Sequence, residues 1–298
     1  SKSPTLDFRT YFIRRFRRIY PTFLLALVTA YVCASIIHGG LLDVRPRELV
    51  VNMFMLQDRA REGNWALMYM GNSPLWSLAY EWWFYMFYFV VRRSTQTLHH
   101  APSLECFAQR ALVLLIAIVG WGSDVLWPNP LGHIASYFIL WWIGVELARE
   151  FMARGTVSIR GQWPMLLGAA YVSMLWALTT VIGTDATIDW YVHPGLTFRH
   201  FATTLLLLAF GWVWYRMGLV GYDRLLRVFG RVAPFSYALY VLHMPVVMLV
   251  AHLRPMPFGF LNLLWLPPLL FAACWWIEQP LQARINRWMS TGPRPPRC

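Results

Sequence analysis

The sequence predicts an all-α fold, a polytopic bundle of transmembrane helices. Hydrophobic residues make up 58% of the 298 residues and charged residues only 13%, whereas about a quarter of a typical soluble domain is charged. The mean hydropathy is +0.44. Apolar runs of the length that crosses a bilayer, about 17 to 25 residues, recur along the whole chain. These observations favour an integral membrane protein.

Eight runs are expected to span the membrane. They cover residues 21–38, 74–91, 111–127, 131–148, 163–182, 197–215, 234–253 and 260–277. A further run at 44–57 is shorter and is broken by Arg47 and Glu48, which favours a helix lying in the interface. We therefore expect one membrane domain over residues 1–290, followed by a Pro/Arg-rich cytoplasmic tail at 291–298.

The distribution of basic residues supports this topology. Only six of the 26 Lys and Arg residues fall on the side opposite to the N-terminus, namely Arg45, Arg47, Arg59, Arg61, Arg199 and Arg254. This asymmetry follows the positive-inside rule if both termini are cytoplasmic. A net charge of +12 could also indicate nucleic acid, but arginines beside apolar spans indicate contacts with the lipid bilayer or with phosphates instead.

The four cysteines have no metal-ligand spacing such as C-x-x-C, so neither a metal site nor a disulfide framework is expected. The chain begins at Ser1 directly on a polar, basic segment. We therefore expect that helices preceding this segment are missing, so that the domain is truncated at its N-terminus.

Four arginines crowd within about two helical turns just before the first expected span. Arg14, Arg15 and Arg18 belong to this cluster with Arg17, and Arg14 and Arg18 share a helix face. Guanidinium groups offer paired hydrogen bonds to phosphate, so the cluster could hold a cytosolic donor such as a coenzyme A thioester. The alternative is a topology anchor on anionic lipid.

A carboxylate lies near the middle of the run 74–91. Burying an ionised group there costs roughly 3 kcal/mol, so Glu81 should face a protein interior or a watery cavity. At helical spacing Ser77, Glu81, Tyr85 and Tyr88 form one polar stripe. Glu81 could orient or protonate a histidine, or help to deprotonate a hydroxyl. It could instead pair with an arginine and hold helices together.

A third polar face lies on the run 234–253, where Ser236, Tyr240 and His243 align. Both Glu81 and His243 fall in the middle third of a bilayer core of about 30 Å, so the two side chains could approach one another. The alternative for His243 is a hydrogen bond between helices.

These segments resemble the acyltransferase-3 family of membrane acyltransferases. Its members carry an RR-x-x-R-I-x-P segment, a W-S-L-x-x-E-x-x-F-Y helix, an S-Y-x-L-Y-x-x-H-x-P helix and a closing I-E-x-P. The chain matches all four in the same order, at residues 14–21, 76–85, 236–245 and 277–280. Four ordered matches are far more specific than one.

The resemblance implies a function and a set of site residues. Family members have ten helices and move an acyl group, here expected to be acetyl, from cytosolic acyl-CoA to a hydroxyl of a sugar or exported glycan, with no bound cofactor. The chain would then be an acyltransferase of the bacterial inner membrane. Glu81 takes the catalytic carboxylate position, Arg15 and Arg18 with Arg14 take the donor positions, and the cavity-lining positions fall to Trp76, Ser77, Tyr85, Tyr240 and His243.

The sequence departs from the family pattern at its N-terminus. The family's first two helices, with the histidine regarded as catalytic, are not found in this sequence, so eight spans are expected instead of ten and the activity of this fragment is in question. Glu278 is expected to be structural, paired with an arginine such as Arg284. The competing class is a non-enzymatic transporter or scaffold, although the paired broken helices or inverted repeat of a transporter are not found.

Overall fold

A computed structural model describes residues 7–58, 63–183, 190–226, 229–253 and 262–288. Within these ranges the regular structure is entirely helical, which confirms the all-α prediction. The Pro/Arg-rich tail expected at 291–298 lies outside the described residues.

Six helices of the described chain are long and apolar enough to cross a membrane. They are α1 (Phe8–His38), α4 (Pro102–Leu126), α5 (Pro130–Arg154), α6 (Ile159–Ile182), α7 (Gly195–Arg216) and α9 (Ser236–Leu253). The other two expected spans coincide with α3 (Leu75–Ser94) and α10 (Asn262–Trp276). Helix α3 is rich in Trp and Tyr and carries Glu81, which lowers its hydropathy, and α10 is described only from residue 262 onward.

The described chain divides into two compact units. The first unit comprises Met53–Leu67 and Ser77–Val220, and the second comprises Asp7–Asn52, Met68–Trp76 and the residues from Gly221 onward. The membrane domain expected at 1–290 therefore contains two separately packed parts.

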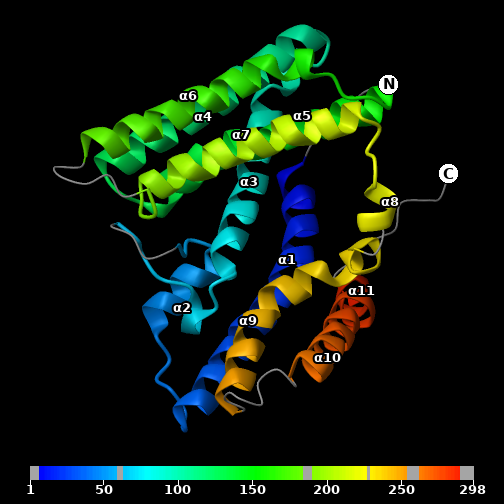
Figure 1. The fold of residues 1–298 in the computed structure, drawn as a ribbon. Helices are drawn as coiled ribbons and strands as arrows, with labels where there is room; N and C mark the ends of the chain where they lie inside the picture. The colour runs from blue at the N-terminus through cyan, green and yellow to red at the C-terminus, as the bar shows by residue number, and fades with distance from the viewer. Residues whose placement is uncertain (1–6, 59–62, 184–189, 227–228, 254–261, 289–298) are drawn as a thin grey trace. The chain divides into compact units, whose positions relative to one another are not determined.

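The first unit is a helical bundle in which α4, α5 and α6 pack against one another and α7 packs on α6 (Figure 1). A short 3-10 helix, η2 (Gln96–Leu98), connects α3 to α4. Glycine allows α4 and α5 to approach closely, since a Cβ on Gly120 would lie 2.7 Å from the carbonyl oxygen of Gly132. Small residues at helix crossings have this role in membrane proteins, where close packing replaces the hydrophobic drive. The interior is filled by large side chains, including Trp142 and Trp176.

The second unit is built on α1, which packs along α9. Its remaining elements are α2 (Pro46–Met53), η1 (Tyr69–Gly71), α8 (Tyr222–Leu225), η3 (Phe229–Arg231), η4 (Ala233–Phe235), α10, η6 (Ile277–Leu281) and α11 (Gln282–Trp288). The Asp7 carboxylate caps α1 by accepting a hydrogen bond of 2.9 Å from the backbone N–H of Thr10, and this bond lowers the pKa of Asp7. Gly39 ends α1 at φ 78°, a left-handed conformation that suits glycine. A helix is present within the segment 44–57, as the sequence predicts.

Candidate functional site

Three of the four sequence motifs meet in the second unit. The Tyr237 hydroxyl on α9 donates a hydrogen bond of 2.8 Å to the carbonyl of Ile19 on α1. The Gln282 side chain, just after η6, donates one of 2.6 Å to the carbonyl of Arg17. Side-chain hydrogen bonds to backbone carbonyls of α1 thus connect three segments that are far apart in the sequence, namely 14–21, 236–245 and 277–280.

Glu278 of the I-E-x-P motif takes part in this assembly. Its carboxyl is half-buried, and burial raises its pKa, while the positive charge of Arg18 and the backbone N–H of Ala238 act in the opposite direction. The sequence suggested Arg284 as the partner of Glu278. The expected ion pair of Glu278 with Arg284 is not found among the described residues, and the positive charge that acts on the Glu278 carboxyl is that of Arg18 on α1.

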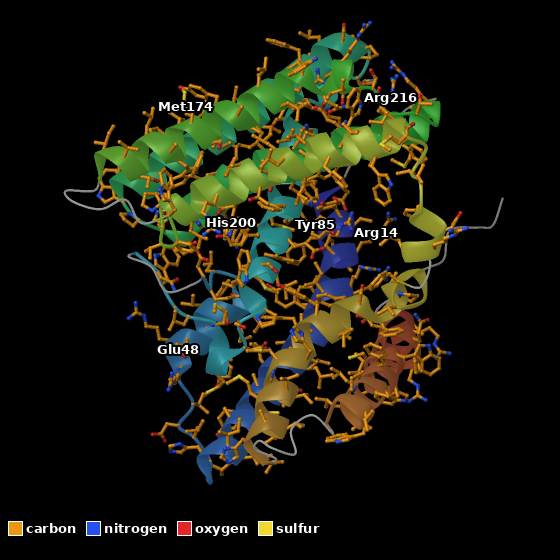
Figure 2. All side chains as sticks on the ribbon, viewed as in Figure 1. Arg14, Glu48, Tyr85, Met174, His200 and Arg216 are labelled. Carbon is orange, nitrogen blue, oxygen red and sulfur yellow. The ribbon has the colours of Figure 1, made fainter. Side chains whose placement is uncertain are left out.

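The arginines predicted to bind the donor lie on one stretch of α1. Arg14 (labelled in Figure 2) and Arg18 are exposed, and Arg15 is half-buried with its guanidinium carbon 5.5 Å from the centre of the Tyr11 ring. Exposed guanidinium groups one helical turn apart, as on Arg14 and Arg18, can contact several oxygens of one phosphate. The geometry is therefore suited to an anionic ligand at this end of α1.

The residues predicted around α9 are partly accessible. Tyr240 is 39% exposed. The Nδ1 atom of His243, which is half-buried, lies 2.8 Å from the carbonyl oxygen of Tyr240 and 3.1 Å from that of Leu239. These carbonyls can only accept, so Nδ1 carries the hydrogen and Nε2 can accept one. Trp76, at the start of α3, is half-buried in the same unit.

Glu81 and Tyr85 form a hydrogen-bonded pair on α3 in the first unit. The Tyr85 hydroxyl donates to Glu81 Oε1 at 2.9 Å, so the two residues share a helix face as the spacing predicts. The neighbouring Ser77 is half-buried. Glu81 itself is exposed, contrary to the burial that the sequence suggested, because the side of α3 that packs inward presents Tyr80 and the apolar side chains around it. Glu81 and His243 belong to different units, so their approach stays a prediction.

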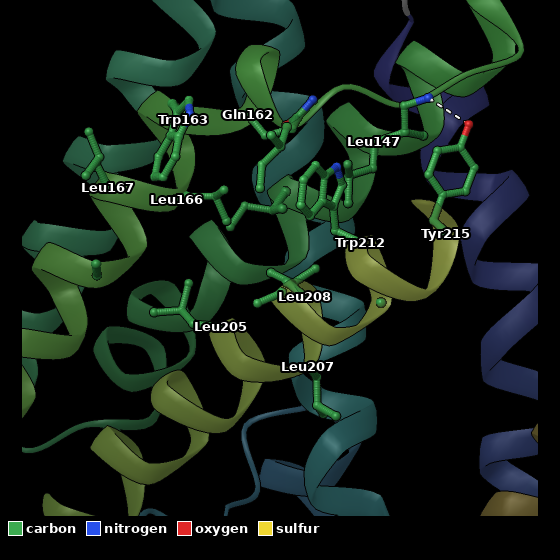
Figure 3. Close-up of a pocket in the computed structure, with 16 residues that line it drawn as sticks. Leu147, Gln162, Trp163, Leu166, Leu167, Leu205, Leu207, Leu208, Trp212 and Tyr215 are labelled. Carbon is green, nitrogen blue, oxygen red and sulfur yellow. Dashed lines mark hydrogen bonds between the residues drawn. The ribbon is translucent and has the colours of Figure 1, made fainter. Parts of the chain in front are cut away.

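The first unit also contains an apolar pocket of about 520 Å³ between α5, α6 and α7 (Figure 3). Its lining is dominated by side chains such as Leu166, Leu208 and Trp212. Near one end the Tyr215 hydroxyl accepts a hydrogen bond of 3.3 Å from the backbone N–H of Val157. No charged side chain lines this pocket in the described chain, so it suits a hydrocarbon chain and not a nucleotide.

A second cavity of about 530 Å³ lies between the first part of α4 and the last turns of α5 and is strongly charged. Its charges are largely paired: Arg110 is 2.6 Å from Glu146 and Arg92 is 2.8 Å from Glu105. Arg149 donates to the side-chain oxygen of Gln109 at 2.9 Å. Such mutual neutralisation favours a role in holding the helices together over a role in binding.

The sequence did not indicate a cluster of Asp124, His133 and His193 in the first unit, in which Asp124 and His133 are buried and His193 is partly exposed. Asp124 Oδ2 lies 2.9 Å from His133 Nδ1 and 3.6 Å from His193 Nε2. The side chains come from the end of α4, the first turn of α5 and the residues just before α7, so no short motif contains them. The available signal was a pair of ionisable residues, Asp124 and His133, on the two sides of one short connection between spans.

Comparison with protein families supports the resemblance found in the motifs. The model of the acyltransferase-3 family, described as an acyltransferase domain, matches residues 1–277 of the 298-residue chain. The chain belongs to the acyltransferase-3 family. The comparison with curated proteins found no match, and neither did the comparison with solved structures. Family membership and the six apolar helices identify an integral membrane protein of acyltransferase type.

Proposed function

We propose that the protein transfers an acyl group, acetyl in the simplest case, from cytosolic acyl-CoA to a hydroxyl of a sugar or an exported glycan. The family match carries this proposal. The exposed arginines of α1 support it, because their guanidinium groups can form hydrogen bonds with the several phosphates of coenzyme A.

In the proposed reaction the thioester C–S bond breaks and an ester C–O bond forms. The acceptor hydroxyl loses its proton to a base and the departing thiolate takes one up. Glu81 is proposed to act in this proton transfer, directly or by orienting a histidine, since it is an ionisable group on an exposed face of α3. Tyr85, which donates to Glu81, would fix the direction of the carboxylate.

Inverted membrane vesicles containing the protein test the proposal. Acetyl-CoA labelled in the acetyl group is added on the cytoplasmic side, and both free coenzyme A and label in the glycan fraction are measured. An acyltransferase releases one coenzyme A for each acetyl group that reaches a hydroxyl. Release of intact acetyl-CoA into the lumen would indicate a transporter, and no change of either quantity would indicate a scaffold.

The proposed location is the bacterial inner membrane with both termini in the cytoplasm. This orientation rests on the asymmetric distribution of arginine. In a variant without the exposed Cys106, a cysteine introduced at position 60 should react with an impermeant reagent from outside and one at position 156 only from inside. Labelling of both from the same side would contradict the orientation.

A further inference from the structure

We propose that Asp124, His133 and His193 bind a divalent transition-metal ion, with Zn²⁺ as the representative. Two imidazoles and a carboxylate are the ligand set of many catalytic zinc sites, in which water or substrate takes the fourth position. The cluster lies in the first unit and shares no residue with the acyl-transfer site proposed above.

The ligand atoms are already close to the required spacing. Metal–ligand distances of about 2.0 to 2.2 Å in a tetrahedron place neighbouring ligand atoms roughly 3.3 Å apart. The distance from Asp124 Oδ2 to His133 Nδ1 is 2.9 Å and that to His193 Nε2 is 3.6 Å. All three ligand atoms lie within 4.8 Å of one another. The two contacts of Asp124 are within a few tenths of an ångström of the tetrahedral spacing, and a movement of the His193 side chain toward His133 would complete the site.

Second contacts orient two of the three ligands toward a common centre. His193 Nδ1 lies 3.0 Å from the hydroxyl of Thr197, which directs the opposite nitrogen, Nε2, toward Asp124. The other carboxylate oxygen, Asp124 Oδ1, accepts a hydrogen bond of 3.0 Å from the backbone N–H of Asn129. Such outer contacts of metal-binding histidines and carboxylates fix their orientation and strengthen metal affinity.

Aromatic side chains pack around the cluster, and they bury Asp124 and His133 while His193 stays partly exposed. The rings of Tyr137 and Trp176 are centred 5.3 and 5.7 Å from that of His133. Asp124 is 1% exposed, and a buried carboxylate is costly without a positive counter-charge. A divalent ion supplies that charge. The 2.9 Å contact between Asp124 and His133 would then exchange its proton for the metal, because metal ligands bind deprotonated.

The experiment uses the full chain, purified in detergent and stripped with a chelator. Zn²⁺ is titrated by calorimetry, and Co²⁺ is added in parallel because its visible absorption reports tetrahedral coordination. We expect one ion per chain. His193→Gln should weaken binding at least 100-fold, since a ligand is lost, and Thr197→Val about 10-fold, in the range reported for outer contacts.

His200→Gln is the matched control. His200 is a histidine of the same unit (labelled in Figure 2) whose Nδ1 faces the Tyr137 hydroxyl at 2.8 Å instead of Asp124, so its replacement should leave metal affinity unchanged. Because His193 lies outside the helices, its glutamine variant is expected to fold, and a matching elution profile checks this. The proposal is overturned if the wild-type chain binds neither ion, or if His193→Gln binds as tightly as His200→Gln.

Discussion

The two compact units differ in whether their charged side chains are paired and buried or exposed. In the first unit several buried ionisable side chains are paired with one another, as in Asp124 with His133 and Arg110 with Glu146. In the second unit Arg14 and Arg18 are exposed on α1. Paired and buried charges stabilise a fold or hold an ion, whereas exposed charges are available to a soluble ligand. We therefore expect substitutions in the first unit to change stability and those in the α1 arginine cluster to change ligand affinity.

Glu81 is an exposed carboxylate of the first unit, and its substitution gives the largest expected effect. Glu81 accepts a hydrogen bond from Tyr85 on its own helix, and its side chain is exposed. Glu81→Gln should therefore leave the thermal stability in detergent unchanged while acetyl transfer per folded molecule falls about 100-fold, the scale of a lost acid–base group.

Glu48→Gln is the control for this experiment, since Glu48 is a carboxylate paired with Arg45 at 3.3 Å on the surface of the second unit. It should retain full turnover. Normal turnover of the folded Glu81→Gln variant would show that Glu81 takes no part in the reaction and has a structural role.

Breaking the Arg110–Glu146 pair should give the next largest effect. Glu146 is 9% exposed and also accepts from the Trp142 indole at 3.0 Å. Arg110→Ala leaves this carboxylate without its cation, and a buried pair broken in this way costs about 3 kcal/mol. Equilibrium unfolding in mixed detergent micelles measures the change.

Arg154→Ala is the matched comparison in the same helical bundle. Arg154 lies 3.6 Å from Glu150 but is 72% exposed, and an exposed pair of this kind contributes at most about 1 kcal/mol. Equal destabilisation by both variants would contradict the contrast between buried and exposed charges.

The smallest expected effect concerns the contact that joins two motifs of the second unit. Tyr237→Phe removes the hydrogen bond from the Tyr237 hydroxyl to the Ile19 carbonyl and should lower the free energy of unfolding by about 1 kcal/mol. The same unfolding measurement applies. A loss larger than that of Arg110→Ala would show that the motif contacts of the second unit carry more of the fold than the buried pairs of the first.

Helices and their approximate limits could be predicted from the sequence because apolar length sets them. The run 131–148, for example, lies inside α5 (Pro130–Arg154). The polar stripe of Glu81 and Tyr85 was also predictable, since a helical period alone places both on one face. The exposure of Glu81 was not, because it depends on which side of α3 packs against other helices.

Contacts between segments that are far apart in the chain could not be predicted from the sequence. Arg18 with Glu278 and Asp124 with His193 are brought together by helix packing, and no local period encodes that packing. The motifs contain both Arg18 and Glu278, but they did not indicate that the charge of Arg18 acts on the Glu278 carboxyl. The histidine cluster has no motif, so only the three-dimensional arrangement shows it.

The central claim is that the arginine cluster of α1 binds the phosphates of an acyl-CoA donor. Calorimetric titration of the purified protein with acetyl-CoA tests it most directly, and Arg15→Ala is the cleanest variant because Arg18 also acts on Glu278. Arg15→Ala should weaken donor binding by about 1 to 3 kcal/mol, the value of lost charge-assisted hydrogen bonds. The control is Arg9→Ala, because Arg9 is an exposed arginine of the same helix outside the motif. This variant should bind the donor as the wild type does. Unchanged affinity of a folded Arg15→Ala protein, or an equal loss in Arg9→Ala, would contradict the claim and leave the cluster as a membrane anchor.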